Sequence, residues 1–188
     1  MFQLTDDDQR LLLQIARNAV RSYLSGRPPR LPEVPPTALT EPHGTFVSIH
    51  KGEDLRGCIG NIHPAGPLYR SVAECAIGAA VGDPRFMPLS APELPEVEFE
   101  ISVLSPLQRV DDIREIQVGK HGLLVSKGTA RGLLLPQVAT MYNWDRQRFL
   151  EETCKKAGLR VDDLKNTTVQ SFSAVVFDEK KFHHSITT

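Results

Sequence analysis

One cysteine of this chain lies between two glycines, two residues after an arginine, in the hexapeptide Leu55-Arg56-Gly57-Cys58-Ile59-Gly60. Side chains alternate between the two faces of a strand, so we expect Arg56, Cys58 and Gly60 to share one face. Two residues of strand advance roughly 6.5 Å, which lets the Arg56 guanidinium reach over the Cys58 sulfur. A neighbouring cation favours the reactive thiolate, and the same face suits an anionic ligand. The hexapeptide therefore indicates a site without identifying a reaction.

The chemistry open to Cys58 depends on its neighbours. A thiolate can act as a nucleophile or redox group, whereas a buried neutral thiol only fills space. A nucleophilic thiol needs a base, so the catalytic hypothesis combines Cys58 and Arg56 with His63 or His121. His50 also lies near in sequence, but a set of His50, Cys58 and His63 matches no common zinc spacing. No metal site is predicted.

A second group of residues suits binding rather than catalysis. The planar guanidinium groups of Arg56 and Arg85 fit a carboxylate or phosphate. Each has a structural alternative, because Arg56 can pair with an internal acid and Arg85 can neutralise Asp83 at a helix end. Glu98 and Glu100 share a strand face, which fits acid–base chemistry or an ordinary exposed sheet surface. The predicted binding positions are Arg56, Gly57, Gly60, Asp83, Arg85, Phe86, Gly122 and Gln137.

The elements that position these residues follow from hydrophobic periodicity. Helices are predicted from the N-cap Thr5 to Gly26, from Pro67 to Gly82, over 137–141, and from the N-cap Asp145 to Gly158. Strands are predicted over 44–50, 55–60, 97–103, 122–126, 132–135 and 172–177. The strands come in hairpin-like pairs with helices between them. This order predicts an α+β fold, with a mostly antiparallel sheet flanked by helices.

The length of 188 residues suits one family domain over 1–188 that divides into two lobes. The proline-dense segment 27–44 is expected to be an extended connector. The lobes suggested by this pattern are 1–43 with 84–188, and a smaller one over 44–83.

Composition excludes several classes of function. The formal net charge is −1 and the basic residues are scattered, so neither a nucleic-acid nor a membrane surface is predicted. Three widely spaced cysteines and an acidic start at Asp6 to Asp8 fit a reduced, cytoplasmic protein without disulfides. Cys75 and Cys154 fall on apolar helix stripes and are expected in the core. No phosphate loop or dinucleotide fingerprint occurs, so no cofactor is predicted.

Four ordered motifs carry a family resemblance. The hexapeptide is followed by Asp83-Pro84-Arg85-Phe86, by Gly119-x-His121-Gly122-Leu123, and by Leu135-Pro136-Gln137-Val138-Ala139-x5-Trp144-Asp145. From about Leu11 to Phe177 the chain resembles the AMME syndrome candidate protein family, whose prokaryotic members are called AmmeMemoRadiSam system protein A. The resemblance implies a two-lobed α+β protein whose motifs meet at a cleft. It also implies a Memo-like protein and a radical-SAM protein as partners.

Three hypotheses about function follow. The favoured one is an accessory protein that binds a small ligand or a partner through a cleft around Arg56-Gly57-Cys58. The second is a thiol-dependent enzyme with Cys58 as its nucleophile. The third makes the chain a substrate that the radical-SAM partner modifies.

Overall fold

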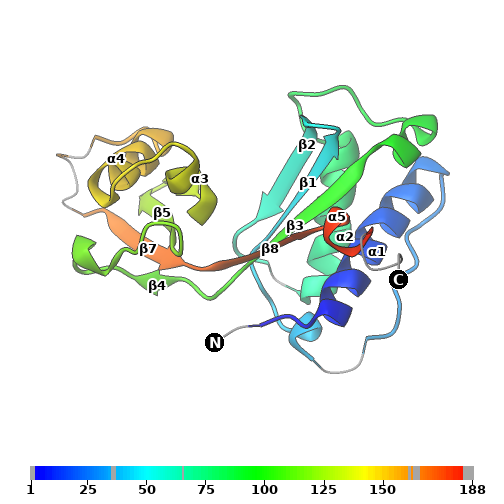
Figure 1. Ribbon diagram of the computed structural model, residues 1–188, viewed down its shortest axis with the longest axis horizontal. Coiled ribbons are helices and arrows are strands. Elements are labelled where there is room, and N and C mark those ends of the chain that lie inside the picture. The colour runs from blue at the N-terminus through cyan, green and yellow to red at the C-terminus, as the bar shows by residue number, and fades with distance from the viewer. Residues whose placement is uncertain (1–2, 35–36, 65, 161, 163–165, 184–188) are drawn as a thin grey trace. The chain divides into compact units, whose positions relative to one another are not determined.

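The computed structural model describes residues 3–34, 37–64, 66–160, 162 and 166–183 (Figure 1). Pro35 and Pro36 of the proline-dense connector lie outside the described residues. The chain forms two compact units, Met1–Leu104 with Val175–Thr188 (unit 1) and Ser105–Ala174 (unit 2). Residues 44–83, suggested above as a smaller lobe, lie within unit 1. Each unit combines an antiparallel sheet with flanking helices, so the predicted α+β fold in two lobes is confirmed.

Unit 1 contains a four-stranded sheet in the order β2-β1-β3-β8, in which β1 pairs antiparallel with both β2 and β3. Its elements are α1 (Asp6–Leu24), η1 (Ala38–Thr40), β1 (Thr45–Lys51), β2 (Asp54–Asn61), α2 (Leu68–Val81), η2 (Ala91–Glu96), β3 (Glu98–Leu104), β8 (Ala174–Asp178) and α5 (Lys180–His183). Because β2 has a neighbour only on the β1 side, it is an edge strand.

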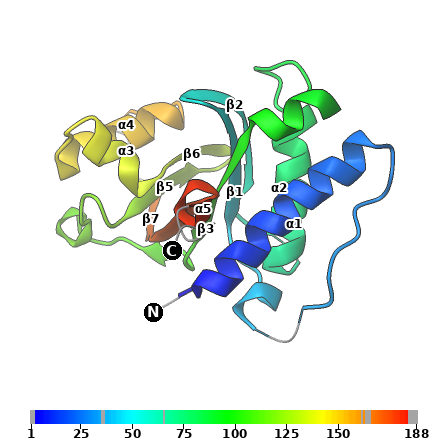
Figure 2. The same ribbon diagram turned by 45° about the vertical axis from the view of Figure 1, so that its right-hand side comes forward.

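Helices α1 and α2 cover one face of this sheet (Figure 2). The start of α1 is fixed by the predicted cap, since Thr5 Oγ1 accepts the Asp8 N–H at 3.1 Å and the Asp8 carboxylate accepts the Thr5 N–H at 3.0 Å. Val47, Ile49 and Phe99 of the sheet are fully buried in the same core as the apolar sides of both helices. Burial of this apolar surface is the main force that holds unit 1 together.

The opposite face of the sheet is more polar. Along β1, fully buried residues alternate with half-buried ones, as expected for a strand whose two faces differ. We call this side the polar face and define it by Ser48, His50, Cys58, Glu98 and Glu100. The predicted strands 44–50, 55–60 and 97–103 thus form three neighbours in one sheet, and they bring Cys58 next to residues of β1.

Unit 2 has a second four-stranded sheet, in the order β4-β7-β5-β6. Its core contains Leu123, Val125 and Phe149, and α4 begins at the predicted N-cap Asp145, whose carboxylate accepts the Arg148 N–H at 2.7 Å. Its elements are β4 (Gln108–Arg109), η3 (Ile113–Glu115), β5 (Gly122–Lys127), β6 (Ala130–Leu134), α3 (Pro136–Met141), α4 (Arg146–Lys156) and β7 (Thr168–Phe172).

The predicted final strand over 172–177 is present as β8, but it starts two residues later than predicted and runs over Ala174–Asp178. Phe172 ends β7 and pairs with Gly122 in unit 2, whereas β8 starts at Ala174 and places Phe177 in the core of unit 1. Ser173 lies between the two strands and its N–H bonds to Ser105 Oγ at 3.0 Å. Within the described part of the chain, every helix is too short or too polar to cross a membrane.

Candidate functional site

Cys58 lies on the edge strand β2, opposite Ser48 of β1. The Ser48 hydroxyl donates a hydrogen bond to Cys58 Sγ at 3.2 Å. The Cys58 side chain is half-buried, so it is neither sealed in the core nor fully exposed. Its backbone N–H points away from β1 and donates to Asp83 Oδ2 at 2.9 Å. The thiol therefore faces a hydroxyl on the polar face. The backbone of Cys58 is bound by Asp83 on the other side, at the free edge of the sheet.

Asp83 follows the end of α2, and its side chain is only 2% exposed. Arg85 donates to it through Nε at 3.0 Å and Nη2 at 2.7 Å, and the Arg85 N–H adds a third bond at 3.1 Å. These bonds, chiefly those from the Arg85 side chain, hold the pKa of Asp83 well below its ordinary value. The same pairing raises the pKa of Arg85, to which the nearby Cys58 also contributes. Arg85 remains 58% exposed beside the thiol.

Arg56 does not lie over the Cys58 sulfur as the sequence suggested. Its guanidinium pairs with Glu93 through Nε at 2.8 Å and Nη2 at 3.1 Å, and Nη1 donates to the Met87 carbonyl at 2.7 Å. A β-bulge explains the difference, because Leu55 pairs with His50 and Gly57 with the preceding Ile49. Arg56 is the extra residue of this bulge, so the alternation of side chains fails there.

The same bulge also changes the face of the sheet on which Leu55 lies. Since Leu55 lies opposite His50 and Cys58 lies opposite Ser48, both belong to the polar face. Unbroken alternation along the hexapeptide would instead place Leu55 on the opposite face, with Gly57 and Ile59. The pairing of Arg56 with Glu93 is the internal-acid alternative that the sequence left open.

The two glycines that flank Cys58 have packing roles. A Cβ on Gly57 would lie 2.0 Å from the Ala79 carbonyl oxygen of α2, so only glycine permits this approach of helix and sheet. A Cβ on Gly60 would lie 2.1 Å from the Phe46 ring, which covers that position. Packing alone explains why both positions are glycine, so neither glycine indicates a ligand site.

Glu100 lies opposite Ser48 on the far side from Cys58, so a row of three side chains crosses β2, β1 and β3. Burial raises the pKa of Glu100, and Asp178 adds to the increase while His50 opposes it. A pocket of about 200 Å³ is lined in part by His50, Glu100 and Asp178. His50 Nε2 is buried and finds no hydrogen-bond partner among the described residues. The sequence singled out neither Ser48 nor Asp178, although the alternation of strand 44–50 marks Ser48 as a polar-face residue.

The other predicted site residues divide between the units. His63 is exposed after β2 and its N–H donates to Asn61 Oδ1 at 3.0 Å. His121, Gly122 and Gln137 belong to unit 2. There His121 Nδ1 accepts the Gln117 N–H at 3.3 Å, and burial lowers the pKa of His121.

Gly122 also has a packing role, since a Cβ there would lie 2.3 Å from the Phe172 ring. Gln137 is half-buried in the first turn of α3. Unit 1 gathers Arg56, Gly57, Cys58, Gly60, Asp83, Arg85 and Phe86 around the edge of β2. No set of three or more His, Cys, Asp or Glu side chains within the described residues is arranged to hold a metal ion.

Exposed apolar side chains adjoin this cluster. Met87 is 80% exposed and Leu55 is 37% exposed, while the Arg85 guanidinium lies 5.3 Å from the centre of the half-buried Phe86 ring. We call Leu55, Arg85, Phe86 and Met87 the edge patch. Its mixture of arginine, methionine and an aromatic ring is typical of protein-binding surfaces.

The chain is similar to known proteins over almost its whole length. A family model named AMMECR1 matches residues 13–177. A protein of Methanothermobacter thermautotrophicus is 44% identical over 185 residues, which cover 94% of this chain and 96% of that protein. Protein MK0488 of Methanopyrus kandleri is 41% identical over 192 residues, covering 95% and 92%. The crystal structure of uncharacterized protein PH0010 from Pyrococcus horikoshii superposes with a TM-score of 0.87 at 38% identity, and covers 95% of each chain.

Proposed function

This chain belongs to the AMMECR1 family, and we propose that it is a binding protein that docks a partner protein on the edge patch beside Cys58. The resemblance to AmmeMemoRadiSam system protein A gives two partners to test, a Memo-like protein and a radical-SAM protein. Catalysis by Cys58 is the weaker alternative.

The observation that carries the proposal is the pairing of both motif arginines with internal acids. Arg56 forms two bonds to Glu93, and Arg85 forms two side-chain bonds to Asp83. A guanidinium that already holds a carboxylate in this way is poorly placed to hold a substrate anion. These pairs instead fix the shape of the surface around Cys58, and a preordered surface loses less entropy on binding.

The surroundings of the thiol support the same conclusion. A cysteine nucleophile is activated by a base within hydrogen-bond reach. Among the described residues, the side chain that hydrogen-bonds to the Cys58 sulfur is the Ser48 hydroxyl, which is too weak a base for that role. Exposed apolar side chains favour association with another chain. Here Leu55 and Met87 supply the apolar part and Arg85 supplies a cation.

The test is calorimetric titration of the full chain with a purified Memo-like protein and, separately, a purified radical-SAM protein from the same organism. Met87→Glu places a charge in the edge patch but leaves the Met87 carbonyl available to Arg56. We expect it to weaken binding about tenfold or more. Met141→Glu is the matched control, because Met141 is 72% exposed in unit 2. Equal binding by both variants, or no binding of either partner by the unchanged chain, would overturn the proposal.

Cys58→Ser separates the remaining hypotheses. A docking surface should keep its affinity in this variant, since serine is of similar size. Loss of a partner-dependent activity with unchanged affinity would support the thiol-dependent enzyme. A mass increase after co-expression with active radical-SAM protein, absent in Cys58→Ser, would make the chain a substrate.

A further inference from the structure

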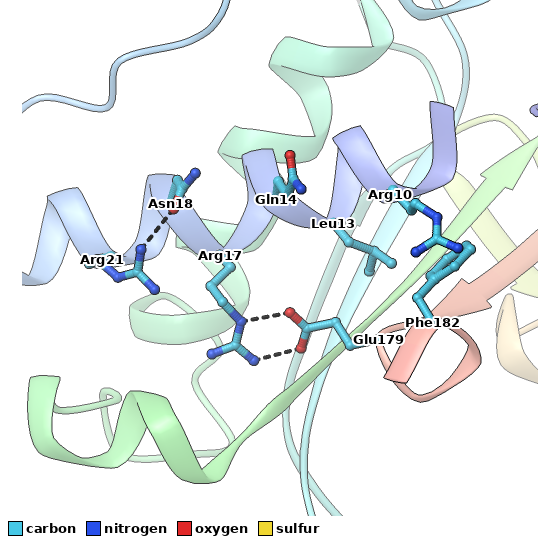
Figure 3. A pocket seen from close by; sticks show the side chains of 8 residues that line it. All are labelled: Arg10, Leu13, Gln14, Arg17, Asn18, Arg21, Glu179 and Phe182. Atoms are coloured by element: carbon cyan, nitrogen blue, oxygen red, sulfur yellow. Dashed lines mark hydrogen bonds and ion pairs between the residues drawn. The ribbon is translucent and has the colours of Figure 1, made fainter. Parts of the chain in front are cut away.

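A pocket of about 470 Å³ lies on the solvent side of α1, in unit 1 (Figure 3). One wall is the helix from Arg10 to Arg21, and the other is the segment from Glu179 to Phe182. Its volume is within the range of ordinary small-molecule sites. We infer that this pocket binds a small organic anion, with its acidic group on Arg10 and its apolar body on Leu13 and Phe182.

The charge of the lining selects an anion. Among the described residues that line the pocket, Arg10, Arg17 and Arg21 are cations and Glu179 is the acid. Arg17 neutralises that acid through two bonds of 2.6 Å, and its guanidinium also donates to the Leu94 and Val97 carbonyls. The pair is therefore a rigid wall that neither attracts nor repels the ligand strongly. Arg10 and Arg21 leave an excess of positive charge on a chain whose formal net charge is −1.

Arg10 is the better placed of these two cations. The Cζ atom of its guanidinium lies 4.3 Å from the centre of the Phe182 ring, so the group lies over an aromatic surface that attracts a cation. No hydrogen bond among the described residues occupies its guanidinium donors, and these donors suit a carboxylate or phosphate. Arg21, by contrast, donates to Asn18 Oδ1 at 2.9 Å. The acidic group of the ligand is thus assigned to the Arg10 end.

The apolar part of the pocket determines the chemistry of the rest of the ligand. Leu13 and Phe182 are almost fully buried at the bottom of the pocket, and the surface that the lining as a whole presents is mostly hydrocarbon. A simple inorganic anion would leave this surface in contact with water, whereas a ligand with a hydrocarbon body covers it. Carboxylates and phosphates with an aliphatic or aromatic body share the required chemistry.

The probe for the test is 8-anilinonaphthalene-1-sulfonate, whose fluorescence rises when its rings leave water. The full, native chain should bind it saturably and with one-to-one stoichiometry. Dodecanoate below its micelle concentration should displace it, whereas dodecyltrimethylammonium of equal chain length and inorganic phosphate should not. Phenyl phosphate then distinguishes an aromatic phosphate from a fatty carboxylate as the preferred form.

Two variants locate the binding. Arg10→Glu should raise the dissociation constant of the probe at least tenfold, while Arg27→Glu, an equal charge change at an exposed residue beyond α1, should change it less than twofold. Gln14→Trp should block the pocket without a change of charge, because exposed Gln14 lines it. Circular dichroism checks that each variant is folded. Unsaturable binding, displacement by the cationic amphiphile, or an affinity in Arg10→Glu and Gln14→Trp equal to that of the unchanged chain would overturn the inference.

Discussion

Asp83 Oδ2 accepts a hydrogen bond from the Cys58 backbone N–H at 2.9 Å. The bond joins the turn after α2 to the free edge of β2, and so links the hexapeptide to the Asp83-Pro84-Arg85-Phe86 motif. Exposed N–H groups at a sheet edge invite pairing with other strands, and charged side chains are one way to block that pairing. The pairing of Asp83 with Arg85 has this effect at Cys58, and it leaves the edge patch, rather than the strand itself, available to a partner.

Asp83→Asn tests this link. The amide keeps an acceptor for the Cys58 N–H but loses the ion pair with Arg85, so we expect a loss of roughly 1–3 kcal/mol in urea unfolding at pH 7. The control is Asp111→Asn, since Asp111 and its partner Arg109 are 76% and 74% exposed and such a pair contributes little. Equal unfolding midpoints for the two variants would contradict the role assigned to Asp83.

The pH dependence of the same variant gives a second readout. The pKa of Asp83 is lower in the folded chain than its ordinary value of 3.8, so the unfolded chain binds more protons below that value. The stabilisation is therefore complete above about pH 4 and is lost as pH falls toward the folded pKa. The stability difference between the unchanged chain and Asp83→Asn should be constant from pH 5 to 8 and should shrink below pH 4.

Gly57→Ala tests the contact between β2 and α2. The added methyl group would lie 2.0 Å from the Ala79 carbonyl oxygen, so the helix must move. Overpacking of this kind costs typically ~1–3 kcal/mol, and the contact here is with backbone rather than a flexible side chain. Gly66→Ala is the control, because nothing lies within 4 Å of a Cβ there. Thermal unfolding should show a lower Tm for Gly57→Ala and little change for Gly66→Ala.

Much of unit 1 follows from local patterns. The capping pair Thr5 and Asp8 fixes the start of α1, and alternation along 44–50 and 97–103 separates the buried face from the polar face. These features depend on residues close in sequence, where spacing determines which side chains share a face. Local spacing likewise predicts the hairpin that contains Cys58.

The neighbours of Cys58 depend on pairing that local patterns do not reveal. The pairs Lys51–Asp54 and His50–Leu55 next to the turn would place Ser48 opposite Gly57 if continued without a break. The bulge at Arg56 shifts the register by one residue and brings Ser48 opposite Cys58. Similarly, periodicity does not show that Phe172 pairs in the sheet of unit 2 while Phe177 packs in the core of unit 1, so the range 172–177 resembles one strand.

Glu100→Gln should stabilise the chain at neutral pH. Burial raises the pKa of Glu100 above its ordinary value of 4.5, so the folded chain keeps a proton that the unfolded chain releases. The free energy of unfolding must then fall as pH rises from about 4.5 through the folded pKa. The glutamine side chain does not titrate, so the variant avoids this decrease in the free energy of unfolding. In urea unfolding from pH 4 to 8, the free energy of unfolding of Glu100→Gln should increasingly exceed that of the unchanged chain as pH rises. The control Glu98→Gln, which breaks a 3.0 Å pair with Lys180, should give no such gain.

Alkylation of the three cysteines separates packing from reactivity. Cys75 is 5% exposed and burial raises its pKa to about 11, and burial also raises the pKa of Cys154, which is fully buried. Cys58 is half-buried on the polar face, so iodoacetamide at pH 8 should give one adduct in the native chain, at Cys58, and three in urea. Mass spectrometry of Cys58→Ser, which should show no native adduct, identifies the site. A docking surface requires no special reactivity, so the native rate should not exceed that of a small exposed thiol such as glutathione. A rate ten or more times higher would instead mean an activated thiolate, and would favour the thiol-dependent enzyme over the binding protein.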